Sequence, residues 1–206
     1  MSKTKIFNLL LIVIAITGGI VSSLTTIING NLYGTLIRLS IIPVMLLPLI
    51  FKKGLKQKIP LSLETVYLIF VFCAHYLGSI LNLYYTIDNY DKIMHLLSGT
   101  ISAVLALMIL IKYKKYDRHH LWFNILFMIA FTMMIAVFWE FYEFKFDILF
   151  SKDAQKVALT GVNDTMYDMA SALMGGVVLS TIYAYIMIPN KLLVFKKIIA
   201  SVKNKV

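Results

Sequence analysis

The chain has 206 residues, of which 60% are hydrophobic and 15% are charged, and its mean hydropathy is +0.82. A water-soluble domain of this length has no core large enough to enclose so much apolar surface, which excludes an ordinary soluble enzyme. The net charge of +10 is typical of membrane-protein loops that face anionic lipid, and we expect no nucleic-acid partner.

Six runs of the sequence are long and apolar enough to cross a hydrocarbon core about 30 Å thick. We therefore expect an all-α membrane bundle. Its spans cover residues 6–28, 35–51, 61–84, 92–111, 121–142 and 165–188. The first run is too long for the core of a signal peptide, so it is interpreted as an uncleaved span. Pro43 and Pro48 are expected to kink the second span, which is the shortest.

The basic residues predict the orientation of these spans. Most of the 20 Lys and Arg residues lie in four segments that alternate along the chain, residues 3–5, 52–58, 112–118 and 191–205. The positive-inside rule assigns these segments to the cytoplasm, so both termini are predicted to be cytoplasmic. Most of the 10 Asp and Glu residues fall at the opposite face. An even number of spans and one acid-rich outer surface follow from this pattern.

Two segments outside the spans, the C-terminal tail and the connection between spans five and six, have a distinctive composition. Residues 1–190 are expected to form one transmembrane domain, followed by a tail over residues 191–206 that alternates apolar residues with Lys. This tail is typical of a basic amphipathic helix on anionic inner-leaflet lipid, although an unstructured basic tail stays open. The connection over residues 143–164 is rich in aromatic residues and is expected to rest at the membrane interface.

Polar pairs occur at the outer ends of spans four, five and six. They are Asp91 and His95, Glu140 and Glu143, and Asp164 and Asp168. Spacings of three or four residues place both members of a pair on one helix face. Because ionisable groups are costly inside a bilayer, these side chains are expected to face the bundle interior. They form either one convergent site or three separate solvated fringes.

A convergent site would carry the five carboxylates of these pairs, and nearby Arg38 would offset only one of them. Such a cluster requires a bound cation or shared protons. Carboxylates with one imidazole suit a divalent Mg, Mn, Fe or Zn ion, without choosing among them. In span three, His75, Ser79 and Asn82 form a stripe toward the same face, and a purely structural role of His75 stays open.

Small residues accompany the polar pairs in spans four and six. They are Ser98, Gly99, Ser102, Ser171, Gly175 and Gly176. Such residues allow helix backbones to approach closely within a membrane, so close packing of these spans is expected. The single cysteine, Cys73, excludes an internal disulfide and a thiolate-rich metal site.

The polar pairs carry a family resemblance. The motifs are Asp91-Lys92-x-x-x-His95-x-x-Ser98-Gly99, Trp139-Glu140-x-x-Glu143, and Asn163-Asp164-Thr165-x-x-Asp168 followed by Gly175-Gly176. In this order they resemble the signature of the YjdF-type integral membrane proteins, over roughly the second half of the chain. The Asp-Lys followed by His is also similar to the VanZ-like membrane proteins. The resemblance implies a bacterial cytoplasmic-membrane protein and supplies no reaction.

Three functions fit these observations. The first is a membrane enzyme that uses a metal or a carboxylate pair on a lipid or cell-envelope substrate. The second is a non-catalytic membrane protein whose polar residues serve packing or partner contacts. The third is a small transporter or ion-binding protein, although the sequence shows no inverted repeat. No nucleophile motif is present, so catalytic residues and oligomeric state stay unassigned.

Overall fold

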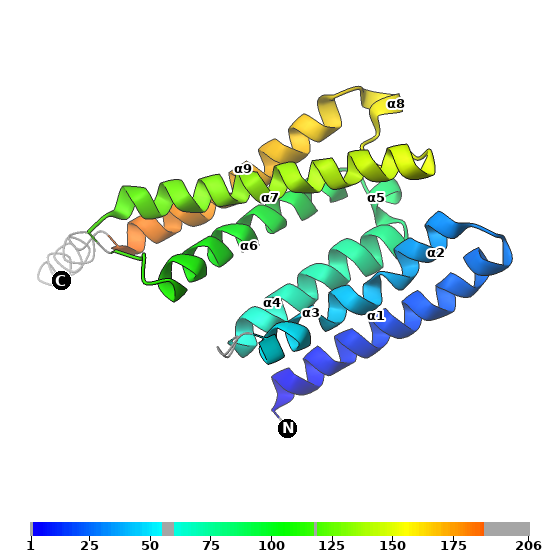
Figure 1. Cartoon of the computed structure of the whole chain (residues 1–206), viewed down its shortest axis with the longest axis horizontal. Helices are drawn as coiled ribbons and strands as arrows, with labels where there is room; N and C mark the ends of the chain where they lie inside the picture. The colour runs from blue at the N-terminus through cyan, green and yellow to red at the C-terminus, as the bar shows by residue number, and fades with distance from the viewer. Residues whose placement is uncertain (1, 55–59, 118, 188–206) are drawn as a thin grey trace, which may run out of the picture. The chain divides into compact units, whose positions relative to one another are not determined.

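The structure is a computed structural model that describes residues 2–54, 60–117 and 119–187. Within these residues all regular structure is helical (Figure 1). The chain divides into two compact units, residues 1–94 and 95–206. The division falls inside helix α6, between Met94 and His95, and α6 itself is continuous and is taken with the second unit.

The first unit is built from three apolar segments and a short connecting helix. Its elements are α1 (Lys3–Ile28), α2 (Leu32–Leu39), α3 (Ile41–Gly54), α4 (Leu61–Val71), η1 (Phe72–Ile80) and α5 (Leu83–Thr86). Its buried core brings Ala15 of α1 together with Ile41 and Met45 of α3 and Leu68 of α4. The lipid-facing sides of these helices carry large exposed apolar residues, as expected of helices in a bilayer.

The second span consists of α2 and α3, and it breaks at Ser40, three residues before Pro43. Pro43 has no N–H to donate to the carbonyl of Leu39, the last residue of α2, so the helix is interrupted there, as a proline kink requires. Pro48 lies inside α3 and cannot donate to the carbonyl of Val44. The Tyr67 hydroxyl, from α4, donates to that carbonyl at 2.8 Å and so replaces the lost bond.

The third span departs from the uniform α-helix expected over residues 61–84. After α4 the backbone continues as the π-helix η1, which ends at Ile80. Asn82 then adopts a left-handed conformation with φ 67°, which Asn tolerates better than most residues. The expected stripe from His75 through Ser79 to Asn82 is therefore not formed as an α-helical face.

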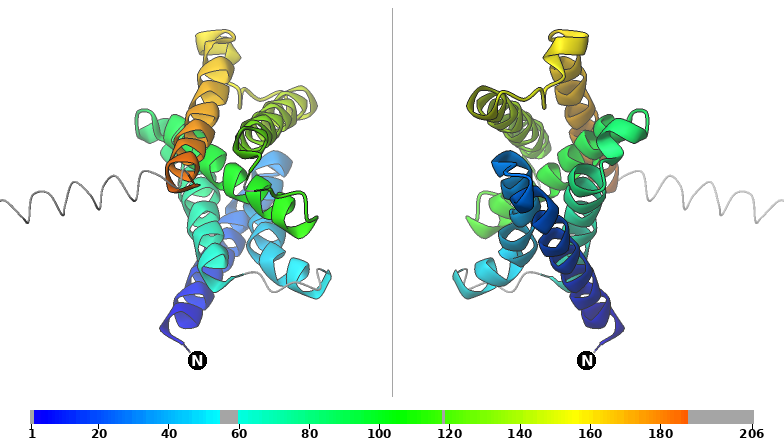
Figure 2. Two further views of the ribbon diagram at one scale, coloured as in Figure 1. Left: turned by 90° about the vertical axis from the view of Figure 1, so that its left-hand side faces the viewer. Right: turned by 90° about the vertical axis from the view of Figure 1, so that its right-hand side faces the viewer.

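The second unit contains α6 (Tyr90–Lys112), α7 (Leu121–Phe150), α8 (Val157–Thr160) and α9 (Asn163–Met187). Helices α7 and α9 lie side by side and are connected through α8 (Figures 1 and 2). The buried face of α7 consists of every fourth residue, namely Asn124, Met128, Thr132, Ala136 and Glu140. This spacing keeps one side of the helix toward its neighbours.

Helices α6 and α9 approach each other closely because glycines face backbone. A Cβ added at Gly99 would overlap the carbonyl of Ala172, and one added at Gly175 would overlap the carbonyl oxygen of Leu96. A Cβ at Gly176 would lie 2.9 Å from the Thr132 hydroxyl oxygen on α7. The prediction that small residues allow close packing is confirmed at these three glycines.

Six segments of the described chain are long and apolar enough to span a membrane. They are Lys3–Ile28, Leu32–Ile50, Leu61–Ile80, Tyr90–Lys112, Leu121–Phe150 and Asn163–Met187, so the six-span fold is confirmed. Helix α7 continues about two turns beyond its predicted end, so the expected 143–164 loop begins only at Ser151. The orientation with both termini inside stays a prediction, and the tail over 191–206 lies outside the described residues.

Candidate functional site

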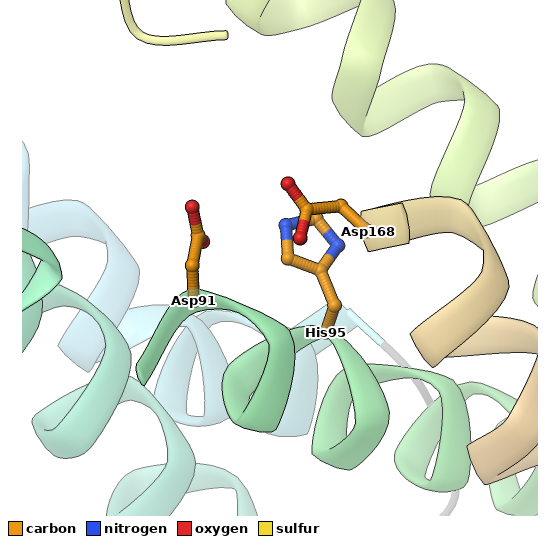
Figure 3. Close-up of side chains that lie close together, drawn as sticks. All are labelled: Asp91, His95 and Asp168. Carbon is orange, nitrogen blue, oxygen red and sulfur yellow. The ribbon is translucent and has the colours of Figure 1, made fainter. Parts of the chain in front are cut away.

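Three side chains at the start of α6 and α9 come together in a geometry suited to a metal ion. Asp91, His95 and Asp168 each offer one ligand atom, and these atoms all lie within 4.8 Å of one another. Figure 3 shows Asp91 and His95 rising from the same face of α6, with Asp168 reaching toward them from α9. His95 and Asp168 are 7% and 3% exposed, and Asp91 is half-buried. We call these three residues the ligand group.

The helices position the ligand group at matching depth. Asp91 and His95 are one turn apart on α6, as their spacing of four residues predicts. His95 and Asp168 each lie five residues after the first residue of their helix, which is about 8 Å along the axis. An acidic residue in the first turn of a helix is also favoured by the helix dipole, and Asp91 occupies that position.

The close helix contact lies one turn below the ligand group. Gly99 follows His95 by four residues, and Ala172 follows Asp168 by four residues. Because Gly99 and Ala172 meet without an intervening side chain, the two backbones are held at a short separation at this level. The reach of the His95 and Asp168 side chains toward each other depends on that separation.

The chemistry of the ligand group favours a cation. Two carboxylates and an imidazole lie close together, and two of these three side chains are buried, so a cation placed among them would find oxygen and nitrogen donors in a site partly shielded from water. Carboxylate oxygens with one imidazole nitrogen are ligands for Mg, Mn, Fe or Zn. Three protein ligands leave coordination positions open, as in catalytic rather than structural metal sites.

The other acids predicted from the sequence lie outside the ligand group and have different neighbours. Glu143 accepts a hydrogen bond from Trp139 Nε1 at 2.9 Å, one turn away on α7. Asp164 is 6% exposed, and its Oδ2 lies 3.4 Å from Lys156 Nζ. Glu140 is 5% exposed and accepts a hydrogen bond at Oε2 from Gln155 Nε2 at 3.3 Å. The structure thus brings three of the six predicted residues together.

Gln155 and Lys156 are neighbours of this acidic surface that the sequence reasoning missed. Both lie in the connection between α7 and α9. The Asp147 carboxylate anchors this connection, because it accepts hydrogen bonds from the N–H groups of Ala154 and Gln155. Gln155 Nε2 also lies 3.4 Å from the hydroxyl of Thr165 in α9. A signal was available, since Lys156 is one of few basic residues on the acid-rich side.

Arg38, His75 and Asn82, predicted as supporting residues, belong to the first unit. Arg38 Nη1 donates to the carbonyl of Gly34 at 3.1 Å, within α2. His75 Nε2 lies 2.9 Å from the Ser40 hydroxyl, at the break between α2 and α3. These contacts fit a structural role for His75, which was one of the two interpretations of the sequence.

Comparison with known proteins identifies the family of the chain. The chain matches the family described as Predicted membrane protein (DUF2238) over residues 7–189, which is the YjdF-type family. No curated protein and no solved structure matches the chain. The similarity to VanZ-like proteins stays a prediction. Because the match covers most of the chain, and six apolar helices are present, the protein belongs to the DUF2238 family of predicted membrane proteins.

Proposed function

We propose that this protein binds a divalent metal ion through Asp91, His95 and Asp168 at the outer surface of a bacterial cytoplasmic membrane. We further propose that the ion serves chemistry on a lipid or cell-envelope substrate. The observation that carries the proposal is the meeting of three ligand atoms from two helices within 4.8 Å. Asp168 is far from Asp91 and His95 in the sequence, yet the three side chains lie together, although charged groups are costly to bury.

The depth of the ligand group supports a substrate drawn from the membrane. It lies about 8 Å from the starts of two spanning helices, close to the level of lipid headgroups. A divalent ion bound there would act as a Lewis acid toward an ester or phosphoryl oxygen. The protein would hold the ion so that its open coordination positions face the lipid headgroups.

Glu140, Glu143 and Asp164 are assigned to the surroundings of the ion rather than to its coordination. Glu140 and Glu143 lie about two to three turns before the end of α7, and Asp164 lies in the first turn of α9. All three have contacts of their own, with Gln155, Trp139 and Lys156 respectively. Acids around a metal site raise the local concentration of cations. Their removal is expected to slow ion uptake more than to abolish binding.

The metal content of the purified protein tests the first part of the proposal. The wild type, reconstituted with Mg, Mn, Fe or Zn and freed of excess ion, is expected to retain one ion per chain. His95→Ala and Asp168→Asn are each expected to weaken binding at least tenfold, because each removes a ligand. Glu143→Gln is the matched control, because it neutralises an acid that is not a proposed ligand, and it should retain the ion. Equal retention in His95→Ala would contradict the proposal.

A lipid assay tests the second part. Metal-loaded protein and the His95→Ala variant are incubated with labelled cell-envelope lipid extract, and the lipid species are compared by mass spectrometry. A species that changes only with the metal-loaded protein is expected. If the ion binds and raises the Tm but no species changes, the non-catalytic interpretation is the better one.

The position of the ligand group relative to the cytoplasm rests on the positive-inside rule. A periplasm-specific reporter fused after Val206 is expected to be inactive, because both termini are predicted to be cytoplasmic. An active reporter would move the ligand group to the cytoplasmic surface and exclude a cell-envelope substrate outside the membrane.

A further inference from the structure

A basic hollow lies at the opposite end of the second unit from the ligand group, where α6 ends and α7 begins. Its volume is about 550 Å³. It is lined by Lys114, Lys115, Tyr116, Asp117, His120 and Phe123. None of these residues takes part in the proposed metal site, so the hollow has a separate explanation.

The end of α6 shapes one wall of the hollow. The N–H groups of Lys115 and Tyr116 both donate to the carbonyl of Leu110, at 2.8 and 3.1 Å. This closure resembles the helix ending that normally carries a glycine in the left-handed conformation, and here Lys114 takes that place with φ 55°. This turn ends α6, and it places the adjacent exposed lysines Lys114 and Lys115 directly after the helix end.

The floor of the hollow is fixed to the neighbouring helices. Asn124 of α7 is fully buried, and its Nδ2 donates to the carbonyl of Asp117 at 2.8 Å and to the Tyr183 hydroxyl at 2.9 Å. The Tyr116 hydroxyl donates to Met187 Sδ at 3.5 Å. Contacts to both α7 and α9 therefore anchor Tyr116 and Asp117, two of the residues that line the hollow.

The charge of the hollow favours an anion despite the presence of Asp117. The Asp117 carboxylate accepts the His119 N–H at 2.8 Å and lies 2.6 Å from His120 Nδ1. These two hydrogen bonds hold the pKa of Asp117 below its ordinary value, so the carboxylate is ionised and contributes one negative charge against the two lysines. The exposed side chains of Lys114 and Lys115 then set the sign of the potential at the opening.

The surroundings of the hollow favour a lipid over a small anion. Lys112 ends one candidate membrane span and Leu121 begins the next, so the hollow lies at the level of the headgroups. From its rim an apolar track runs along α7 into the hydrocarbon region, with Phe123 52% exposed and Leu126 66% exposed. A ligand with an anionic head and an apolar chain uses both features, whereas free phosphate uses only the first.

We propose that this hollow binds the headgroup of an anionic phospholipid. Lys114 and Lys115 hold the phosphate, Tyr116 and Phe123 contact the glycerol region, and an acyl chain follows the track past Leu126. Basic pockets between the ends of membrane helices are typical headgroup sites. The proposal does not depend on the metal site.

Native mass spectrometry of the full-length protein in detergent tests this assignment. The protein is titrated with phosphatidylglycerol and with phosphatidylcholine of the same acyl chains. The wild type is expected to prefer phosphatidylglycerol. The double variant Lys114→Gln and Lys115→Gln is expected to bind phosphatidylglycerol about 30-fold more weakly, because the loss of each lysine lowers the affinity for an anionic headgroup about fivefold. Phosphatidylcholine carries the same phosphate together with a choline cation that offsets its charge, so its weaker binding should fall much less.

A variant with the same loss of charge elsewhere is the control. Lys3→Gln with Lys5→Gln removes two exposed lysines at the start of α1 and should leave the preference intact. An equal loss in this control would overturn the proposal, because the effect would then be one of net charge. Displacement of phosphatidylglycerol by an equal concentration of inorganic phosphate would also overturn it, since the ligand would be a small anion. The Tm in phosphatidylcholine confirms that each variant is folded.

Discussion

Gly99→Ala should separate α6 from α9 and so weaken metal binding without touching a ligand. A Cβ at Gly99 would lie 2.6 Å from the Ala172 carbonyl carbon and 2.8 Å from its Cα. Carbon atoms in contact are normally about 3.5–4.0 Å apart, and the obstruction is helix backbone that cannot rotate away. The two helices must therefore move apart by roughly 1 Å at this level.

Two measurable effects follow from that displacement. Overpacking of this kind lowers the free energy of unfolding by about 1–3 kcal/mol. Metal–oxygen and metal–nitrogen bonds of about 2.0–2.2 Å tolerate deviations of only about 0.2 Å. Because His95 and Asp168 lie one turn above the contact, the variant is expected to lose one of these bonds and to bind the ion at least tenfold more weakly.

Calorimetric titration of the ion, with the Tm measured in parallel, checks this prediction. Gly18→Ala is the control, because its added methyl crowds the Tyr76 ring in the first unit and leaves α6 and α9 unchanged. The control should lower the Tm and keep the wild-type Kd. If Gly99→Ala keeps the wild-type Kd, the helix contact does not set the geometry of the ligand group and the reasoning fails.

Two further predictions concern the membrane helices themselves. Tyr67→Phe removes the donor to the Val44 carbonyl and should lower the free energy of unfolding by about 1–3 kcal/mol. In a Pro48→Ala background the N–H of residue 48 can donate to the Val44 carbonyl, so Tyr67→Phe should lower the free energy of unfolding much less. Equal losses in the two backgrounds, measured by urea or thermal unfolding, would show that the Tyr67 hydroxyl does not replace the missing bond. Trp122 and Trp139 lie about 26 Å apart along α7, so single-tryptophan variants in vesicles should both be quenched by headgroup-level probes. Strong quenching of either by probes at the bilayer centre would refute the assigned span.

The sequence predicts the spans well because run length and charge are properties of the chain alone. It locates their interruptions less well. Two prolines predict kinks in the second span, but only the break at Ser40, three residues before Pro43, is present, and Pro48 lies inside the continuous helix α3. Helix α7 continues past the point where acids appear, because hydropathy marks the membrane boundary and hydrogen bonding sets the helix end.

The candidate site shows the same division between local and tertiary information. Spacing alone placed Asp91 and His95 on one face of α6, and the structure agrees. Which acids join them depends on how α9 and α7 are rotated about their axes, which spacing within a helix does not determine. Asp168 joins His95 in the ligand group, whereas Glu140 accepts a hydrogen bond from Gln155. Gln155 lies in a connection whose sequence has no periodic signal.

The π-helix η1 changes how the third span can vary during evolution. In an α-helix, inserting or deleting one residue rotates every later side chain by about 100°, so such events inside a membrane span disrupt packing. A π-helix holds an extra residue in each turn, because its hydrogen bonds reach one residue further. Loss of about one residue for each of its two turns within Phe72–Ile80 would allow the segment to close as an ordinary α-helix. Relatives that differ by one or two residues in length are therefore expected to differ here, in the first unit, rather than in the helices that carry the ligand group.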